Sequence, residues 1–195
     1  MYKESLRVHL IDTPGFDASI RTDVDVLRDV ASWFSDTYER GIRLSGIIYL
    51  HRISDVRMGG LARRNLVLFL KLCGPSCLPN VILATTFWDI TEPSIAAQRE
   101  RQLIENEVIW GFMHSHGSTI LRHSGSRQSA MAILERSLRN RCRMTLQIQR
   151  EINIEGLYLN ETEAGRQLNE DISREQQRLE QQIEELRERM EESLT

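Results

Sequence analysis

The fold class of this chain is decided by the stretch NVILATTFWD, residues 80–89. Its first part, residues 81–86, has strand length and is continuously apolar from Val81 to Ala84, before Thr85, Thr86 and a turn that contains Asp89. Continuous apolar strands, rather than alternating ones, are typical of parallel sheets that are covered on both faces. The stretch therefore predicts a buried parallel strand with polar groups at its carboxyl end.

Strands and helices alternate on both sides of this stretch. Short apolar runs predict further strands at residues 6–11, 46–50 and 119–123. Helical spacing of apolar residues predicts helices at 22–40, 59–73, 93–113 and 126–141. Thr22 or Asp23 is expected to cap the first helix, and Gly41 to stop it. This alternation predicts an α/β fold with a parallel sheet, in which ligands bind at the carboxyl ends of the strands.

The composition indicates a soluble globular chain, with 41% hydrophobic and 27% charged residues. The net charge of −3, without a basic block, argues against a nucleic-acid-binding protein. No apolar run reaches the ~18 residues of a transmembrane segment. Cys73, Cys77 and Cys142 fit a reduced compartment, so we expect a cytoplasmic protein. We interpret Cys73 and Cys77 as small hydrophobic residues near a helix end rather than as zinc ligands.

The sequence changes character from residue 142 onward. A charged helix is expected from about residue 166, with apolar residues at threes and fours: Leu168, Ile172, Leu179, Ile183, Leu186, Met190 and Leu194. The pattern also repeats every 11 residues, which suits a nearly straight apolar stripe. We expect residues 142–195 to form a helical, coiled-coil-like tail that makes a homodimer or docks on a partner protein. A charged helix face that is simply solvated is the alternative.

The first motif with chemical meaning is Asp12-Thr-Pro-Gly15, directly after the predicted strand 6–11. A nucleotide triphosphatase needs a carboxylate at a strand end to hold Mg²⁺, usually through water. It also needs a glycine whose backbone N–H approaches the γ-phosphate without a Cβ in the way. Asp12 and Gly15 supply these groups. An ordinary turn between strand and loop is the alternative interpretation.

The second motif is Thr85-Thr86-Phe87-Trp88-Asp89, after the strand 81–86. A carboxylate there can accept hydrogen bonds from N1 and N2 of guanine, which adenine does not offer. The hydroxyl of Thr86 can bond loop backbone, and the ring of Phe87 can stack on a base. A buried aromatic pair that caps the strand is the alternative. Asp12 and Asp89 nevertheless both follow strands, with one complete strand between them, and together they favour a guanine nucleotide.

Four segments carry a resemblance to a known family: LIDTPGFDAS, SGIIYLHRISDVRMGG, FLKLCG and NVILATTFWD. They are similar to the fungal G-domain-containing proteins, which are P-loop GTPases related to septins and to the immunity-associated and chloroplast-import GTPases. The similarity covers roughly residues 5–141. It implies a G domain of the P-loop NTPase type, a three-layer sandwich around a parallel sheet, that binds GTP and Mg²⁺. Asp12 would be associated with the magnesium, Gly15 would sense the γ-phosphate, and Asp89 with Thr86 would select guanine, while His123 is a weaker assignment in the last base-contacting loop.

The phosphate loop of such a domain, Gly-x-x-x-x-Gly-Lys-[Ser/Thr], occurs nowhere in the sequence. We therefore expect residues 1–141 to be a partial G domain without the phosphate loop and switch I, unable by itself to bind GTP tightly or to hydrolyse it. No catalytic residue is assigned. The competing hypothesis is a pseudo-GTPase, an interaction module that acts through its C-terminal helix.

Overall fold

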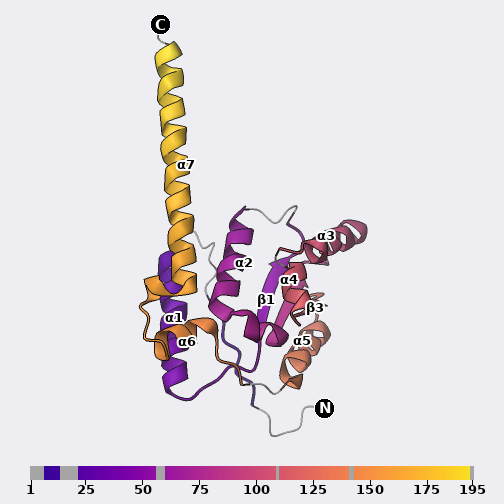
Figure 1. The fold of residues 1–195 in the computed structure, drawn as a ribbon. Helices are drawn as coiled ribbons and strands as arrows, with labels where there is room; N and C mark the ends of the chain where they lie inside the picture. The colour runs from indigo at the N-terminus through magenta and orange to yellow at the C-terminus, as the bar shows by residue number, and fades with distance from the viewer. Residues whose placement is uncertain (1–6, 14–21, 56–59, 109, 141–142, 194–195) are drawn as a thin grey trace.

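The computed structural model describes residues 7–13, 22–55, 60–108, 110–140 and 143–193 (Figure 1). Within these residues, three parallel strands form one sheet in the order β1-β2-β3. They are β1 (Ile47–Arg52), β2 (Val81–Thr86) and β3 (Thr119–Arg122). Ile47 pairs with Val81, and Ile82 with Thr119. The predicted α/β class, the parallel sheet and the long C-terminal helix are confirmed.

Helices lie on both faces of the sheet. One face is covered by α2 (Gly60–Cys73), α3 (Pro93–Glu105) and α4 (Trp110–Ser115), whose apolar side chains surround Val81 and Leu83. The other face is covered by α5 (Arg127–Arg139), which packs Ile133 on Ile82 and Ala84. In β2, the central strand, residues 81–85 are all buried, as expected of a parallel strand that is covered on both faces, whereas the residues of β1 and β3 are half-buried or exposed.

A second core lies beside the sheet and joins α1 (Asp23–Glu39), α2, α6 (Gln147–Asn153) and α7 (Glu163–Ser193). The 3-10 turn η2 (Leu159–Glu161) connects α6 to α7 in this core, and a second 3-10 turn, η1 (Pro75–Asn80), leads from α2 to β2 of the sheet. Its buried side chains come from both halves of the chain and include Leu27, Leu72, Met144, Leu146, Ile148 and Leu168. The core therefore continues past residue 141, and the division into domains at that residue stays a prediction. Cys73 and Cys77 are buried in this cluster, as expected of small hydrophobic residues.

Local signals set several helix ends. Thr22 Oγ1 accepts a hydrogen bond of 3.2 Å from the backbone N–H of Asp25 and so caps α1. Ser126 caps α5 in the same way through the N–H of Ser129. Gly41 follows α1 with φ of +72°, a left-handed conformation that ends helices. The predicted cap and stop of the first helix are confirmed.

Helix α7 is anchored by its first turns and then leaves the body of the molecule (Figure 1). Leu168 is buried and Ile172 packs against the second core, whereas Leu179, Ile183, Leu186 and Met190 are 48–64% exposed. The first part of the predicted stripe therefore belongs to the core of the chain itself, and only its later part can meet a second copy or a partner protein. The first turns of α7 pack mainly against α2 and η2, and also against α1, so these elements provide its place in the core.

The predicted strand at residues 6–11 was wrong for its described residues. Residues 7–13 contain no strand, and all of them are exposed. A strand needs a hydrogen-bonded neighbour, and within the described chain β1 pairs with β2 alone. The helix that follows, α1, packs on α6 and α7 and so does not return the chain to the sheet as a crossover helix would.

The predicted helix at 93–113 is divided into α3 and α4. The interruption is at Asn106, whose side-chain Oδ1 accepts a hydrogen bond of 3.1 Å from the N–H of Val108. The carbonyl of Asn106 also accepts from the N–H of Gly111 at 2.9 Å. Asparagine competes for backbone groups in this way, and a helix ends where the competition succeeds.

Candidate functional site

The predicted base-reading residues lie at the carboxyl ends of β2 and β3. Thr86 Oγ1 donates a hydrogen bond of 3.2 Å to the carbonyl of His51 at the neighbouring end of β1. The backbone N–H of His123 donates to the carbonyl of Thr85 at 2.8 Å. Asp89 follows in the loop after β2 and is exposed. The fold therefore brings Thr86, Asp89 and His123 to one edge of the sheet.

His123 is held by the first turn of α5. Its Nδ1 lies 2.8 Å from Ser129 Oγ in a hydrogen bond. The same hydroxyl accepts from the backbone N–H of Ser124 at 3.2 Å. One nitrogen of the ring is thus engaged within the protein, and the orientation of the imidazole is fixed by α5.

The two aromatic residues of the loop after β2 point in different directions. Trp88 packs against the core that the sheet forms with α2, α3 and α4, and its Nε1 donates to Thr85 Oγ1 at 3.0 Å. Phe87 is 45% exposed and has φ of +62°. A non-glycine residue in the left-handed region costs about 1–3 kcal/mol and is held there by its surroundings. Here Thr91 Oγ1 donates to the carbonyl of Phe87 at 2.8 Å. Because the side chain of Phe87 is exposed, its ring is open to stacking.

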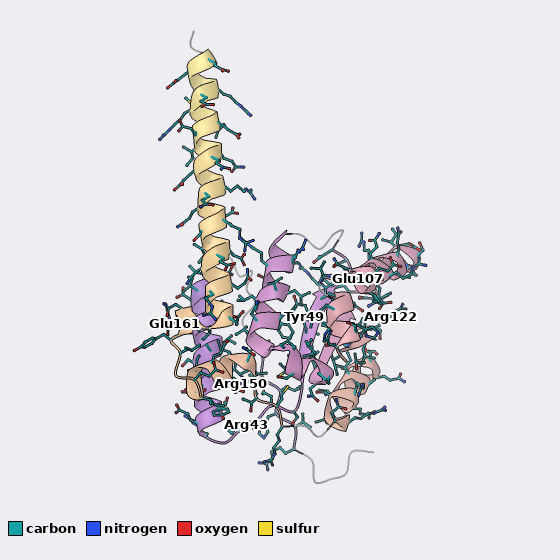
Figure 2. All side chains as sticks on the ribbon, viewed as in Figure 1. Arg43, Tyr49, Glu107, Arg122, Arg150 and Glu161 are labelled. Carbon is teal, nitrogen blue, oxygen red and sulfur yellow. The ribbon has the colours of Figure 1, made fainter. Side chains whose placement is uncertain are left out.

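An ion pair that the sequence does not reveal supports this loop. Arg122, labelled in Figure 2, donates from Nε to both carboxylate oxygens of Glu100 at 2.9 and 3.0 Å, and from Nη2 as well. Glu100 is buried, and its carboxylate raises the pKa of Arg122. The guanidinium also stacks 4.2 Å from the centre of the Trp88 ring. Arg122 therefore joins β3, α3 and the loop that carries Asp89.

His51, at the end of β1, is also fixed by packing. Its ring lies 5.6 Å from that of Trp110 in an edge arrangement. Burial lowers the pKa of His51 from its ordinary value of 6.5, because the charged imidazole loses its water, and Asp55 only partly opposes this effect. Arg99 Nη1 fastens the following turn by donating to the carbonyls of Ile53 and Ser54 at 3.0 and 2.8 Å.

The predicted magnesium residue, Asp12, does not follow a strand in the structure. Asp12 is exposed in the segment 7–13, so the expectation that it ends a buried strand was wrong. Gly15 lies outside the described residues. Among the residues that the structure describes, no group of three or more His, Cys, Asp or Glu side chains could hold a metal ion. GTP and Mg²⁺ as ligands stay predictions.

A second candidate site is the exposed α7 stripe, which we define as Leu179, Ile183, Leu186 and Met190. Its first member also lines a cleft of about 210 Å³ between α7 and α2, together with Leu68, Leu168 and Ile172. Apolar side chains thus continue from the core, through the cleft, onto the projecting half of the helix. The stripe can be predicted from its spacing in the sequence, but which part of it is buried cannot.

Comparison of the chain with known protein families, with curated proteins and with solved structures found no match. In the described part of the chain, no helix is both long and apolar enough to cross a membrane. The resemblance to G-domain proteins stays a prediction that rests on the motifs of the sequence.

Proposed function

We propose that this chain is a protein-interaction module that acts through the exposed α7 stripe. The observation that carries the proposal is a helix anchored in the core whose next four apolar side chains, on one face, are 48–64% exposed. Single exposed apolar residues are common on protein surfaces, whereas a contiguous apolar patch marks an interaction surface. The charged residues on the other faces of α7 keep the helix in water until a partner covers the stripe.

The anchor of α7 favours this role. An isolated amphipathic helix is only marginally stable in water, because the first turn is costly to form. In this chain Ala164 and Leu168 are buried in the second core, so the first turns are already formed. A helix that is ordered before it binds loses less conformational entropy on association.

The proposal is tested by changing the stripe without touching the body. In an extract of its own cells, we expect the full chain to elute from gel filtration as part of a complex, at an apparent mass larger than that of its monomer. Ile183→Asp together with Leu186→Asp should abolish that complex, because both charges would have to be buried. Glu188→Gln, outside the stripe, should leave it unchanged. Elution of the unaltered chain as a monomer, both purified and in the extract, would contradict the proposed role.

A second function, recognition of a guanine base, is favoured by the placement of Thr86, Asp89 and His123 at one sheet edge. Ligands of α/β proteins bind at this edge. We propose weak binding without measurable hydrolysis, because phosphate-loop contacts, each worth roughly 1.5–3 kcal/mol, are missing from the sequence. The exposed carboxylate of Asp89 would read guanine N1–H and N2–H.

A nucleotide titration followed by amide NMR signals tests this second function. GTP with Mg²⁺ should move the signals of residues 85–91, and ATP should not. Asp89→Asn replaces an acceptor oxygen by a donor, which should cost about 2–4 kcal/mol of GTP binding and favour xanthosine triphosphate. Equal responses to GTP and ATP, or an unchanged preference in Asp89→Asn, would exclude Asp89 as the base reader.

A further inference from the structure

We propose that the exposed α7 stripe is covered by the same stripe of a second copy of this chain, running antiparallel. The inference rests on the proposed function of the stripe as an interaction surface and adds the identity of its partner. Figure 2 shows the side chains of α7 all around its projecting half, and beyond Leu179, which lines the cleft with α2, no other described element lies beside them. A second helix therefore has open access to Ile183, Leu186 and Met190, and it reaches the edge of the cleft at Leu179.

The spacing of the stripe is the first argument for a second copy. Leu179, Ile183, Leu186 and Met190 follow one another at intervals of four, three and four residues. This order is the same in both directions along the helix. Two antiparallel copies can therefore place Leu179 of one chain against Met190 of the other, and Ile183 against Leu186, with every apolar side chain matched.

The flanking charges are the second argument, and they select the antiparallel direction. Glu180 and Arg187 each directly follow a leucine of the stripe and so lie on the same side of it. In the antiparallel pair, Glu180 of each copy lies beside Arg187 of the other. A parallel pair would instead place Glu175 of one copy beside Glu180 of the other, which brings like charges together twice.

The position of the anchor is the third argument. The core holds α7 through Leu168 and Ile172, so the stripe begins only where the helix leaves the body. Antiparallel pairing over residues 179–190 puts the two bodies at opposite ends of the paired helices, where they do not collide. In its own chain Arg187 pairs with Glu184, in an exposed contact of 3.6 Å that it can exchange for Glu180 of the second copy at little cost.

Sedimentation equilibrium of the purified full chain tests the inference, with circular dichroism as a control for folding. The chain should show a concentration-dependent equilibrium of monomer and dimer, and Ile183→Asp should be monomeric. Glu180→Arg should weaken the dimer by about tenfold, because two attractive contacts become repulsive. Glu188→Arg makes the same change of charge outside the stripe and should have little effect. A mixture of Glu180→Arg with Arg187→Glu should restore dimers, since each altered charge then meets its opposite.

The possible outcomes separate this inference from the proposed function. A purified chain that stays monomeric, while its complex in extract still depends on Ile183 and Leu186, would overturn the second copy and leave the interaction module in place. A dimer that Glu180→Arg tightens would overturn the antiparallel direction, because only the parallel pair brings residue 180 beside Glu175. A dimer that survives Ile183→Asp would show that another surface holds the copies together.

Discussion

At the carboxyl edge of the sheet, some residues hold the loop after β2 in place and others in that loop are exposed to solvent. Arg122 and Trp88 fasten the loop after β2, while Phe87 and Asp89 in the same loop face solvent. The left-handed conformation of Phe87 shows that its surroundings fix the backbone there against an intrinsic preference. A fixed loop that presents an aromatic ring and a carboxylate suits the recognition of a planar, hydrogen-bonding group.

The pKa of His51 predicts how stability depends on pH. The folded chain lowers this pKa from 6.5, because the imidazole is buried against Trp110. Below about pH 6.5 the unfolded chain consequently takes up more protons than the folded chain at this site, so stability decreases as the pH falls. Urea unfolding at several pH values should show this decrease, and it should be smaller in His51→Gln. Equal pH dependence in the two proteins would mean that His51 is not held neutral by burial.

Arg122 predicts a loss of stability on truncation. Arg122→Ala leaves the buried carboxylate of Glu100 without its partner and removes a cation–π contact with Trp88. We expect the free energy of unfolding to fall by about 2–4 kcal/mol, since a buried charge that loses its partner is costly. Arg127→Ala, at the exposed start of α5, is the matched control and should change stability by less than about 0.5 kcal/mol. A similar effect of the two substitutions would contradict a supporting role for the ion pair.

Some of this site could be predicted from the sequence, because strand ends follow from local apolar patterns. Thr86, Asp89 and His123 come to one edge for that reason alone. The pairing of Arg122 with Glu100 could not be predicted, since it joins β3 to α3 through tertiary packing that leaves no local signal. The predicted strand before Asp12 was wrong for a related reason. A strand also depends on a neighbouring strand, which its own residues do not specify.

At the scale of elements, spacing and caps identified most helices and all three described strands of the sheet. Thr22 and Ser126 set helix starts through side-chain hydrogen bonds that the sequence makes recognisable. The division of α3 from α4 was missed because an asparagine within a helical pattern is compatible with a continuous helix until its local hydrogen bonds form.

Gly165 predicts an unusual effect of alanine within a helix. Alanine normally stabilises a helix by about 1 kcal/mol relative to glycine. A Cβ at Gly165, however, would lie 1.9 Å from the carbonyl oxygen of Leu159, where the turn η2 contacts the first turn of α7. We expect Gly165→Ala to destabilise the chain by about 1–3 kcal/mol in urea unfolding, because η2 and α7 must separate.

The matched control for Gly165 is Gly60→Ala in the first turn of α2. A Cβ at Gly60 meets nothing within 4 Å, so the substitution should be neutral or slightly stabilising. If both alanine variants raised the stability of the chain, the close packing of η2 against α7 would be refuted.

At the scale of the whole molecule, a sheet core and a helical core share α2 and are followed by a projecting helix. α2 contributes Leu66 to the first cluster and Leu68 and Leu72 to the second. A substitution that displaces α2 in one core therefore also changes the packing of the other core. The stripe of α7 therefore starts from a rigid base, since Leu168 and Ile172 connect it to α1 and α2.

This arrangement predicts different outcomes for two truncated chains. A chain that ends at residue 141 lacks the side chains that complete the second core, among them Leu146, Ile148 and Leu168. Each buried aliphatic side chain contributes about 1.5–3 kcal/mol, so their joint loss is comparable with the 5–15 kcal/mol that stabilises a typical domain. A chain that ends at residue 175 keeps all of them and loses only the exposed α7 stripe.

We expect residues 1–175 to unfold cooperatively on heating and to remain monomeric, whereas residues 1–141 should show no cooperative transition. Thermal unfolding followed by circular dichroism, with amide NMR spectra to report fixed packing, distinguishes them. Dispersed spectra and a cooperative transition for residues 1–141 would instead establish a domain boundary at residue 141. The second core would then be a contact between two independent units, because α1 and α2 would hold their packing without the segment that covers them.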